Sequence, residues 1–201
     1  MKVGIFGGTF SPPHKGHVNA AACFQKQFSL DRLLIVPAAF PPNKEGSEIL
    51  PARHRLAMCR LAFAGIDGCT VSDIELQRGG TSYTYLTLSE LSAPDRELYL
   101  LMGSDMFLTL GSWMRPDEIF RLATIVAAGR VNDPETDDAL ERTRAELLSR
   151  YGGKIEFLQN PIIEISSSLL RERIANGAGT DEYLTPSVRE YIEKENLYHV
   201  F

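Results

Sequence analysis

Short apolar segments, separated by stretches with helical periodicity, constrain the fold of this chain more than any other feature. The segments cover residues 3–6, 33–36, 71–76, 98–102, 124–128 and 155–158. Most of them are continuously apolar rather than alternating, which is typical of strands that are buried on both faces of a parallel sheet. Residues 71–76 are more mixed in polarity, so we expect that strand nearer an edge.

Residues with helical spacing fill the intervals between these segments. The pattern predicts helices over residues 16–28, 51–64, 84–91, 134–150, 168–175 and 186–195, of which 134–150 is heavily charged and expected at the surface. Alternating strands and helices imply right-handed crossovers and a sheet covered on both faces. We therefore predict an α/β fold with a Rossmann-like, open, mostly parallel sheet, helices on both faces and a small C-terminal helical portion. With no linker-like stretch, residues 1–201 are expected to form one domain.

Composition narrows the class of protein. A chain of 201 residues that is 44% hydrophobic and 23% charged can build one α/β domain and is neither disordered nor fibrous in composition. Its net charge of −5 argues against a nonspecific nucleic-acid binder, but not against a small anionic ligand. The three cysteines lie far apart, which argues against a disulfide framework or a zinc ribbon.

The sequence also bears on location and assembly. No apolar run reaches the length of about 18 residues that a membrane span requires, so we expect a cytoplasmic protein without a membrane segment. Whether the chain forms a homo-oligomer is not determined by its sequence.

In an open parallel sheet, ligands bind beyond the carboxyl ends of the strands, so the loops that follow strands matter most for function. The loop after the first predicted strand contains Gly7, Gly8, Thr9, Phe10, His14, Gly16 and His17. Its glycines let the backbone turn and approach a ligand closely. The start of the next helix offers N–H groups and a positive dipole end to an anion. We interpret this loop, with its two imidazoles, as a phosphate-binding site.

Other interpretations of this loop are open. A double glycine after a strand is common in α/β folds, and the pattern is neither GxGxxG nor a P-loop. His14 and His17 could bind zinc, although His54 and His199 lie far away in the sequence and no cysteine is near. One histidine at a helix start is often structural, but two that flank a glycine in such a loop are harder to explain in that way.

A segment near the C-terminal end has similar chemistry. It follows the predicted strand 155–158 and contains Ile165, Ser166, Ser167, Ser168 and Arg171. Serine is a favoured N-cap, and the planar guanidinium of an arginine one turn into the helix suits a phosphate. A plain serine cap with a surface arginine explains the segment equally well when it is taken alone.

The middle of the chain supplies further candidates. They are Lys44 in a proline-rich loop, Ser82, Tyr83 and Thr84 before a predicted helix, Gly103 and Asp105 at the end of a strand, and Trp113. Each also has a structural explanation: a solvated lysine, a turn, a helix cap or a core aromatic. Gly103 and Asp105 follow a strand, which places them well for a ribose.

In their order along the chain, these segments resemble a known family. Residues 7–17 and 165–171 resemble the Gly-Gly-Thr-Phe…His-x-Gly-His and Ile-Ser-Ser-Thr-x-x-Arg signatures of the HxGH nucleotidyltransferase superfamily, whose members release pyrophosphate. The Lys44 loop, residues 82–84, 103–105, Trp113 and the tail 183–192 resemble bacterial nicotinate-nucleotide adenylyltransferases. The sequence departs from the family pattern at Ser11, often Asp, at Asn43, often His, and at Ser168, usually Thr.

The resemblance implies that ATP and nicotinate mononucleotide give deamido-NAD and pyrophosphate. It implies catalytic roles for His14, His17, Lys44 and Arg171, and ATP binding by Gly7, Gly8, Thr9, Phe10, Gly16, Gly103, Asp105, Ile165, Ser166, Ser167 and Ser168. It further implies that Ser82, Tyr83, Thr84 and Trp113 frame the pyridine ring and its carboxylate. The expected cofactor is Mg²⁺, held mainly by phosphates and water rather than by protein ligands.

Four alternatives stand beside this interpretation. The acceptor could be phosphopantetheine, although those enzymes are shorter and lack the segments around residues 82–84 and Trp113. It could also be nicotinamide mononucleotide, which the sequence separates only weakly from the acid. A non-catalytic nucleotide sensor would be favoured by loss of His17, Lys44 or Arg171, and all three are present. A zinc-binding structural module is the last alternative.

Overall fold

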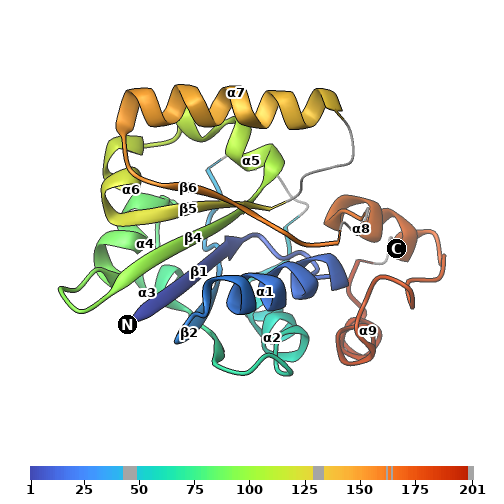
Figure 1. Ribbon diagram of the computed structural model, residues 1–201. Helices are drawn as coiled ribbons and strands as arrows, with labels where there is room; N and C mark the ends of the chain where they lie inside the picture. The colour runs from blue at the N-terminus through green and yellow to red at the C-terminus, as the bar shows by residue number, and fades with distance from the viewer. Residues whose placement is uncertain (43–48, 129–133, 162, 164, 199–201) are drawn as a thin grey trace.

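A six-stranded sheet, in which all strands run parallel, forms the centre of the computed structural model, which describes residues 1–42, 49–128, 134–161, 163 and 165–198 (Figure 1). The strands are β1 (Lys2–Gly8), β2 (Arg32–Pro37), β3 (Cys69–Val71), β4 (Glu97–Gly103), β5 (Ala123–Ala128) and β6 (Ile155–Leu158). Their order across the sheet is β3-β2-β1-β4-β5-β6. The chain winds outward from β1 in one direction and from β4 in the other. The crevice between these two strands is where sheets of this kind bind ligands.

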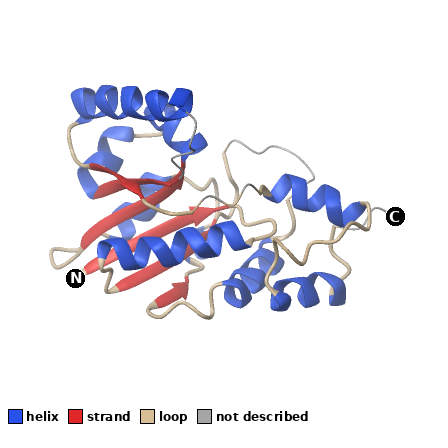
Figure 2. Cartoon of the chain, turned by 45° about the vertical axis from the view of Figure 1, so that its right-hand side comes forward, coloured by secondary structure: helices blue, strands red, loops and turns tan. Residues whose placement is uncertain are grey.

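Helices cover both faces of the sheet. One face is covered by α1 (Lys15–Phe28) and α2 (Ala52–Ala62), and α8 (Ser167–Ala175) and α9 (Pro186–Lys194) contribute side chains to the same core. The other is covered by α4 (Thr84–Leu91), α5 (Ser104–Leu108), α6 (Pro116–Leu122) and α7 (Pro134–Tyr151). The remaining described helices are short: α3 (Ile74–Arg78) and the 3-10 helix η1 (Leu110–Ser112). Figures 1 and 2 show the C-terminal helices beyond the end of the sheet that is opposite to the N-terminus.

Alternate residues of each inner strand enter different cores. In β2, Leu33 and Ile35 pack in the core with α1 and α2, whereas Leu34 and Val36 pack in the core on the opposite face. All four side chains are buried, since both faces of the sheet are covered. This double burial explains why the strands are continuously apolar in sequence, and it confirms the predicted Rossmann-like sheet with a small C-terminal helical portion.

One predicted strand was largely wrong. Residues 71–76 were expected to be extended, but β3 ends at Val71 and α3 begins at Ile74. The N–H of Ser72 still bonds to the carbonyl of Ile35, and the Ser72 hydroxyl then accepts the N–H of Ile74 at 3.4 Å. A serine side chain that bonds to backbone in this way favours a turn over a strand. The expected position at the edge of the sheet is confirmed, because β3 is the outermost strand beyond β2.

The charged segment 134–150 forms the long helix α7, as predicted, and buries Leu140 and Leu147 beneath an otherwise mostly polar surface. The short helices α5 and α6 were not predicted. Within the described residues, no helix has the length and apolar character needed to cross a membrane.

Candidate active site

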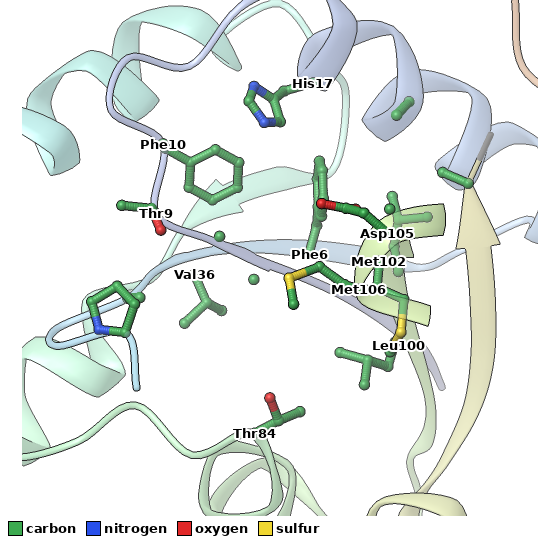
Figure 3. Close-up of a pocket in the computed structure, with 18 of the residues that line it drawn as sticks. Phe6, Thr9, Phe10, His17, Val36, Thr84, Leu100, Met102, Asp105 and Met106 are labelled. Carbon is green, nitrogen blue, oxygen red and sulfur yellow. The ribbon is translucent and has the colours of Figure 1, made fainter. Parts of the chain in front are cut away.

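A pocket of about 730 Å³ lies at the carboxyl ends of β1 and β4, where the winding of the sheet reverses (Figure 3). Small-molecule sites have volumes of about 300–1,000 Å³, so this pocket suits a ligand of nucleotide size. Segments that are far apart in the sequence meet here. The predicted residues that line the pocket are Gly7, Gly8, Thr9, Phe10, His14, Gly16, His17, Ser82, Tyr83, Thr84, Gly103, Asp105, Trp113, Ile165 and Ser167.

His14 and His17 cap the start of α1 reciprocally. His14 is the N-cap residue, and its Nδ1 accepts the backbone N–H of His17 at 3.3 Å. The Nδ1 of His17 accepts the N–H of His14 at 3.2 Å. This is the geometry of a capping box, with imidazoles in place of the more usual serine and glutamate. The helix predicted over residues 16–28 therefore begins one residue earlier, at Lys15, with His14 as its cap and His17 in its first turn.

The reciprocal cap fixes which nitrogen carries the proton in each ring when that ring is neutral. A neutral imidazole whose Nδ1 accepts a hydrogen bond carries its proton on Nε2. His14 is only 7% exposed, and burial lowers its pKa to about 4, so its ring is neutral near pH 7. The two rings are stacked, with centroids 3.6 Å apart. His14 therefore presents a neutral N–H donor to the pocket and contributes no positive charge near pH 7.

Phe10 holds residues 7–17, called the phosphate loop after the ligand predicted for it, in a constrained shape. Its φ of 49° lies in the left-handed region, which costs a residue with a side chain about 1–3 kcal/mol. The ring is 2% exposed and makes edge contacts with Phe6, Phe63 and His17. Burial of the ring compensates for the backbone cost. A Cβ on Gly8 would lie 2.9 Å from this ring, so glycine is required there.

The segment near the C-terminal end, residues 165–171, contacts the phosphate loop directly. Ser166 caps α8 by accepting the N–H of Leu169, and the Ser167 hydroxyl donates to the carbonyl of Pro12 at 2.9 Å. Arg171 donates to the carbonyl of Ser11 at 3.0 Å and to the hydroxyl of Ser168 at 3.1 Å.

The described lining of the pocket includes Ile165 and Ser167 but not Ser166, Ser168 or Arg171. The hydroxyl of Ser166 is used as the cap of α8. Side chains of the C-terminal segment thus hold the first loop by its backbone carbonyls at Ser11 and Pro12.

The segment of residues 82–84 forms the opposite wall, and Figure 3 shows Thr84 across the pocket from His17. The Ser82 hydroxyl accepts the N–H groups of Ala39 at 2.8 Å and of Phe40 at 3.2 Å. Ser82 therefore ties this wall to the loop after β2, a function that the sequence did not indicate. Tyr83 and Thr84 line the pocket and begin α4.

Gly103 and Asp105 lie where β4 passes into α5. A Cβ on Gly103 would lie 2.7 Å from the carboxylate of Asp105, so glycine leaves room for that side chain. Asp105 is exposed and faces the pocket (Figure 3). The indole N–H of Trp113 donates to the Thr109 hydroxyl at 3.2 Å, which leaves the face of the ring as its available surface in the pocket.

Sequence reasoning missed several pocket residues. Glu75 is 7% exposed, accepts the Thr87 hydroxyl at 2.6 Å and lines the pocket. Met102 and Met106 give the β4 side an apolar surface (Figure 3). Arg55 of α2 was also missed; it does not line the pocket, but it donates to three carbonyls of the surrounding loops. A signal for it existed, because Arg55 precedes Cys59 by four residues and therefore shares the buried face of the helix.

Two predictions concern cations. Lys44 lies outside the described residues, so its predicted role is not tested. The described residues contain no group of three or more His, Cys, Asp or Glu side chains that could hold a metal, which gives the zinc interpretation of His14 and His17 no third ligand.

Comparisons with known proteins agree with this geometry. The chain matches the cytidylyltransferase-like family over residues 5–173. A relative from Lachnoclostridium phytofermentans, named a probable nicotinate-nucleotide adenylyltransferase, is 40% identical over 199 residues and covers 98% of both chains. One of the same name from Streptococcus pneumoniae is 36% identical over 199 residues, which is 98% of this chain and 88% of the relative.

A solved structure shows the same fold. The nicotinic acid mononucleotide adenylyltransferase of Plasmodium falciparum, complexed with NaAD, aligns with a TM-score of 0.76 at 20% identity, over 98% of this chain and 97% of that one. Together with the pocket at the reversal of the sheet, these matches define the chain as a nucleotidyltransferase of the cytidylyltransferase-like class. Within that class, it belongs to the family of nicotinate-nucleotide adenylyltransferases.

Proposed function

We propose that this enzyme transfers the adenylyl group of ATP to nicotinate mononucleotide, giving deamido-NAD and pyrophosphate. The observation that carries the proposal is the reciprocal cap of His14 and His17 at the edge of the pocket. It holds two imidazoles by their Nδ1 atoms, so that the proton of each neutral ring lies on Nε2, next to a helix start that attracts anions. The match to relatives of this name over nearly the whole chain supports the choice of reaction.

The chemistry requires little more than positioning. An oxygen of the mononucleotide phosphate attacks the α-phosphorus of ATP in line, a new P–O–P bond forms, and the bond to pyrophosphate breaks. The attacking phosphate is already an anion near pH 7, so no general base is needed. Catalysis then rests on orientation and on stabilising charge in the transition state.

His17 is assigned as the donor to an α-phosphate oxygen, because its Nδ1 is occupied by the N–H of His14. His14 is assigned as a neutral donor to the neighbouring phosphates, since its pKa of about 4 excludes a positive charge near pH 7. Positive charge must therefore come from elsewhere. Lys44 and Arg171 are assigned to the leaving pyrophosphate, and a planar guanidinium suits that group well.

Mg²⁺ fits this site as a metal held by the nucleotide. Mg²⁺ keeps several water ligands and binds together with substrate phosphates, so the nucleotide would supply most of its remaining ligands. When bound, it would supply charge neutralisation at the phosphate oxygens. Asp105 and Gly103 are assigned to the adenosine ribose, and Tyr83, Thr84 and Trp113 to the pyridine ring on the opposite wall.

A pyrophosphate-release assay with ATP and Mg²⁺ tests the proposal. It compares nicotinate mononucleotide, nicotinamide mononucleotide and phosphopantetheine as acceptors under the same conditions. We expect release to be fastest with nicotinate mononucleotide. Faster release with either of the other two would assign the enzyme to that acceptor, and binding of ATP without release with any acceptor would indicate a nucleotide sensor.

A further inference from the structure

Arg55 is a cation in an unusual position, because it is buried among backbone carbonyls rather than paired with a carboxylate. It is 1% exposed and projects from the first turn of α2. In the described part of the chain no carboxylate forms an ion pair with it. Burying a charge without such a pair is unfavourable unless hydrogen bonds compensate for it. The bonds that Arg55 makes therefore point to what it does.

Each nitrogen of the guanidinium holds a different loop position. Nη1 donates to the carbonyl of Thr9 at 2.9 Å, Nη2 to that of Ala39 at 3.3 Å, and Nε to that of Leu50 at 3.0 Å. Thr9 belongs to the phosphate loop after β1, and Ala39 to the loop after β2. One rigid, planar group thus sets the distance between two loops that follow neighbouring strands.

The contact continues to the opposite wall of the pocket. The N–H of Ala39 donates to the Ser82 hydroxyl at 2.8 Å, and the N–H of Ser82 donates to the carbonyl of Phe40 at 2.9 Å. The path from Thr9 through Arg55 and Ala39 to Ser82 is called the Arg55 bridge below. Thr9 and Thr84, which lies two residues beyond Ser82, line the pocket from different sides (Figure 3).

We propose that Arg55 is a positioning residue that sets the spacing between the phosphate loop and the wall formed by residues 82–84. This proposal rests on the proposed adenylyl transfer, in which the first loop binds ATP and the wall binds the acceptor. In-line attack requires the two bound phosphates to meet at a fixed distance, and a misplacement of about 1 Å can cost about 100-fold in rate. Each substrate alone needs only its own side of the pocket.

The test compares Arg55→Lys with Arg60→Lys. Lysine keeps the charge, but its three N–H groups share a single nitrogen, so they cannot reach carbonyls that three separate nitrogens of the guanidinium hold. Arg60 lies on the same helix and is exposed, which makes it a matched control. In Arg55→Lys we expect kcat at saturating substrates to fall by about 10- to 100-fold. The dissociation constants of ATP and of the mononucleotide, each measured alone, should stay close to those of the wild type. An unchanged kcat, or a loss carried wholly by weaker binding of one substrate, would overturn the proposal.

A second variant keeps the test valid if Arg55→Lys is poorly folded. Ser82→Ala removes the far end of the Arg55 bridge, and we expect it to lower kcat with little change in melting temperature. If both side chains act through one bridge, the double variant should lose no more kcat than the worse single variant. Losses that multiply would mean that the two residues act independently, which contradicts the bridge.

A third measurement separates this proposal from the proposed function. If wild-type protein releases no pyrophosphate with any of the three acceptors, the proposed reaction fails whatever the variants do. Amide hydrogen exchange then tests the bridge by itself. Arg55→Lys should speed exchange in residues 38–40 and 82–83, whereas Arg60→Lys should not. Faster exchange confined to α2 would contradict the bridge.

Discussion

The imidazoles of His14 and His17 each accept the backbone N–H of the other residue, and the rings stack with centroids 3.6 Å apart. A helix start is thereby capped by the same two groups that face the pocket. The arrangement assigns two functions to each ring: Nδ1 satisfies the backbone, and Nε2 is left to carry the proton. The functions can be separated by substitution.

His17→Ala should lower kcat by about 100-fold or more, as loss of a single donor to developing charge does in other active sites. His17→Gln keeps an acceptor for the N–H of His14, because glutamine is a normal partner in a capping box. This variant should melt near the wild-type temperature while remaining impaired in kcat. Steady-state pyrophosphate release and thermal unfolding measure the two effects. His54→Ala is the control, because the ring of His54 bonds to the Tyr191 hydroxyl and is not among the pocket residues. Wild-type turnover in His17→Ala would contradict the proposal that this ring donates to an α-phosphate oxygen.

Stability should depend on pH through His14. An imidazole in the unfolded chain has a pKa of 6.5, whereas burial lowers the pKa of folded His14 to about 4. Below pH 6.5 the unfolded chain therefore binds a proton that the folded chain does not. The stabilisation is fully present above pH 6.5 and is lost as the pH falls toward 4, by about 2–3 kcal/mol at pH 4.5.

Urea unfolding at pH 7 and pH 4.5 measures this effect. Asparagine is also a good N-cap, so His14→Asn keeps the helix start but lacks the titrating ring. The free energy of unfolding should fall more for the wild type than for His14→Asn between the two pH values, by about 2–3 kcal/mol. Equal losses in both proteins would show that His14 is not the group responsible.

Gly7 and Gly8 are neighbours with different constraints. A Cβ on Gly7 would meet only the carbonyl of Val36 at 4.0 Å, whereas a Cβ on Gly8 would lie 2.9 Å from the buried ring of Phe10. Gly8→Ala should therefore destabilise the fold by about 1–3 kcal/mol through overpacking. Gly7→Ala should unfold like the wild type but bind ATP more weakly, because Gly7 is exposed in the pocket. Urea unfolding and calorimetric titration with ATP distinguish the two. If Gly7→Ala binds ATP normally, the nucleotide does not approach the end of β1.

The strands could be predicted where burial on both faces of the sheet produces a continuously apolar sequence. Residues 33–36 are continuously apolar because both faces of β2 are covered, and this pattern needs no knowledge of the neighbouring strands. The strand predicted over residues 71–76 was largely wrong, because the side chain of Ser72 bonds to the local backbone and the strand ends at Val71. An apolar residue count does not register such a bond.

The candidate site also has residues that the sequence could identify and residues that it could not. Its glycines and histidines could be found from the sequence, because a turn after a strand and the start of a helix are local features with local residue preferences. The function of Arg55 could not, since its acceptors belong to Thr9, Ala39 and Leu50. Nor could the bonds of the Ser82 hydroxyl to the loop after β2, because a turn serine has many local alternatives.

The sequence by itself therefore determined the buried strands, the longer helices, the candidate loops and the resemblance to a nucleotidyltransferase family. The tertiary structure decided which of those residues meet the pocket and which hold its walls together. The physical reason is the range of the interactions. Apolar periodicity and helix capping act over a few residues, whereas a buried guanidinium or hydroxyl bonds to whatever backbone the packed sheet brings within about 3 Å.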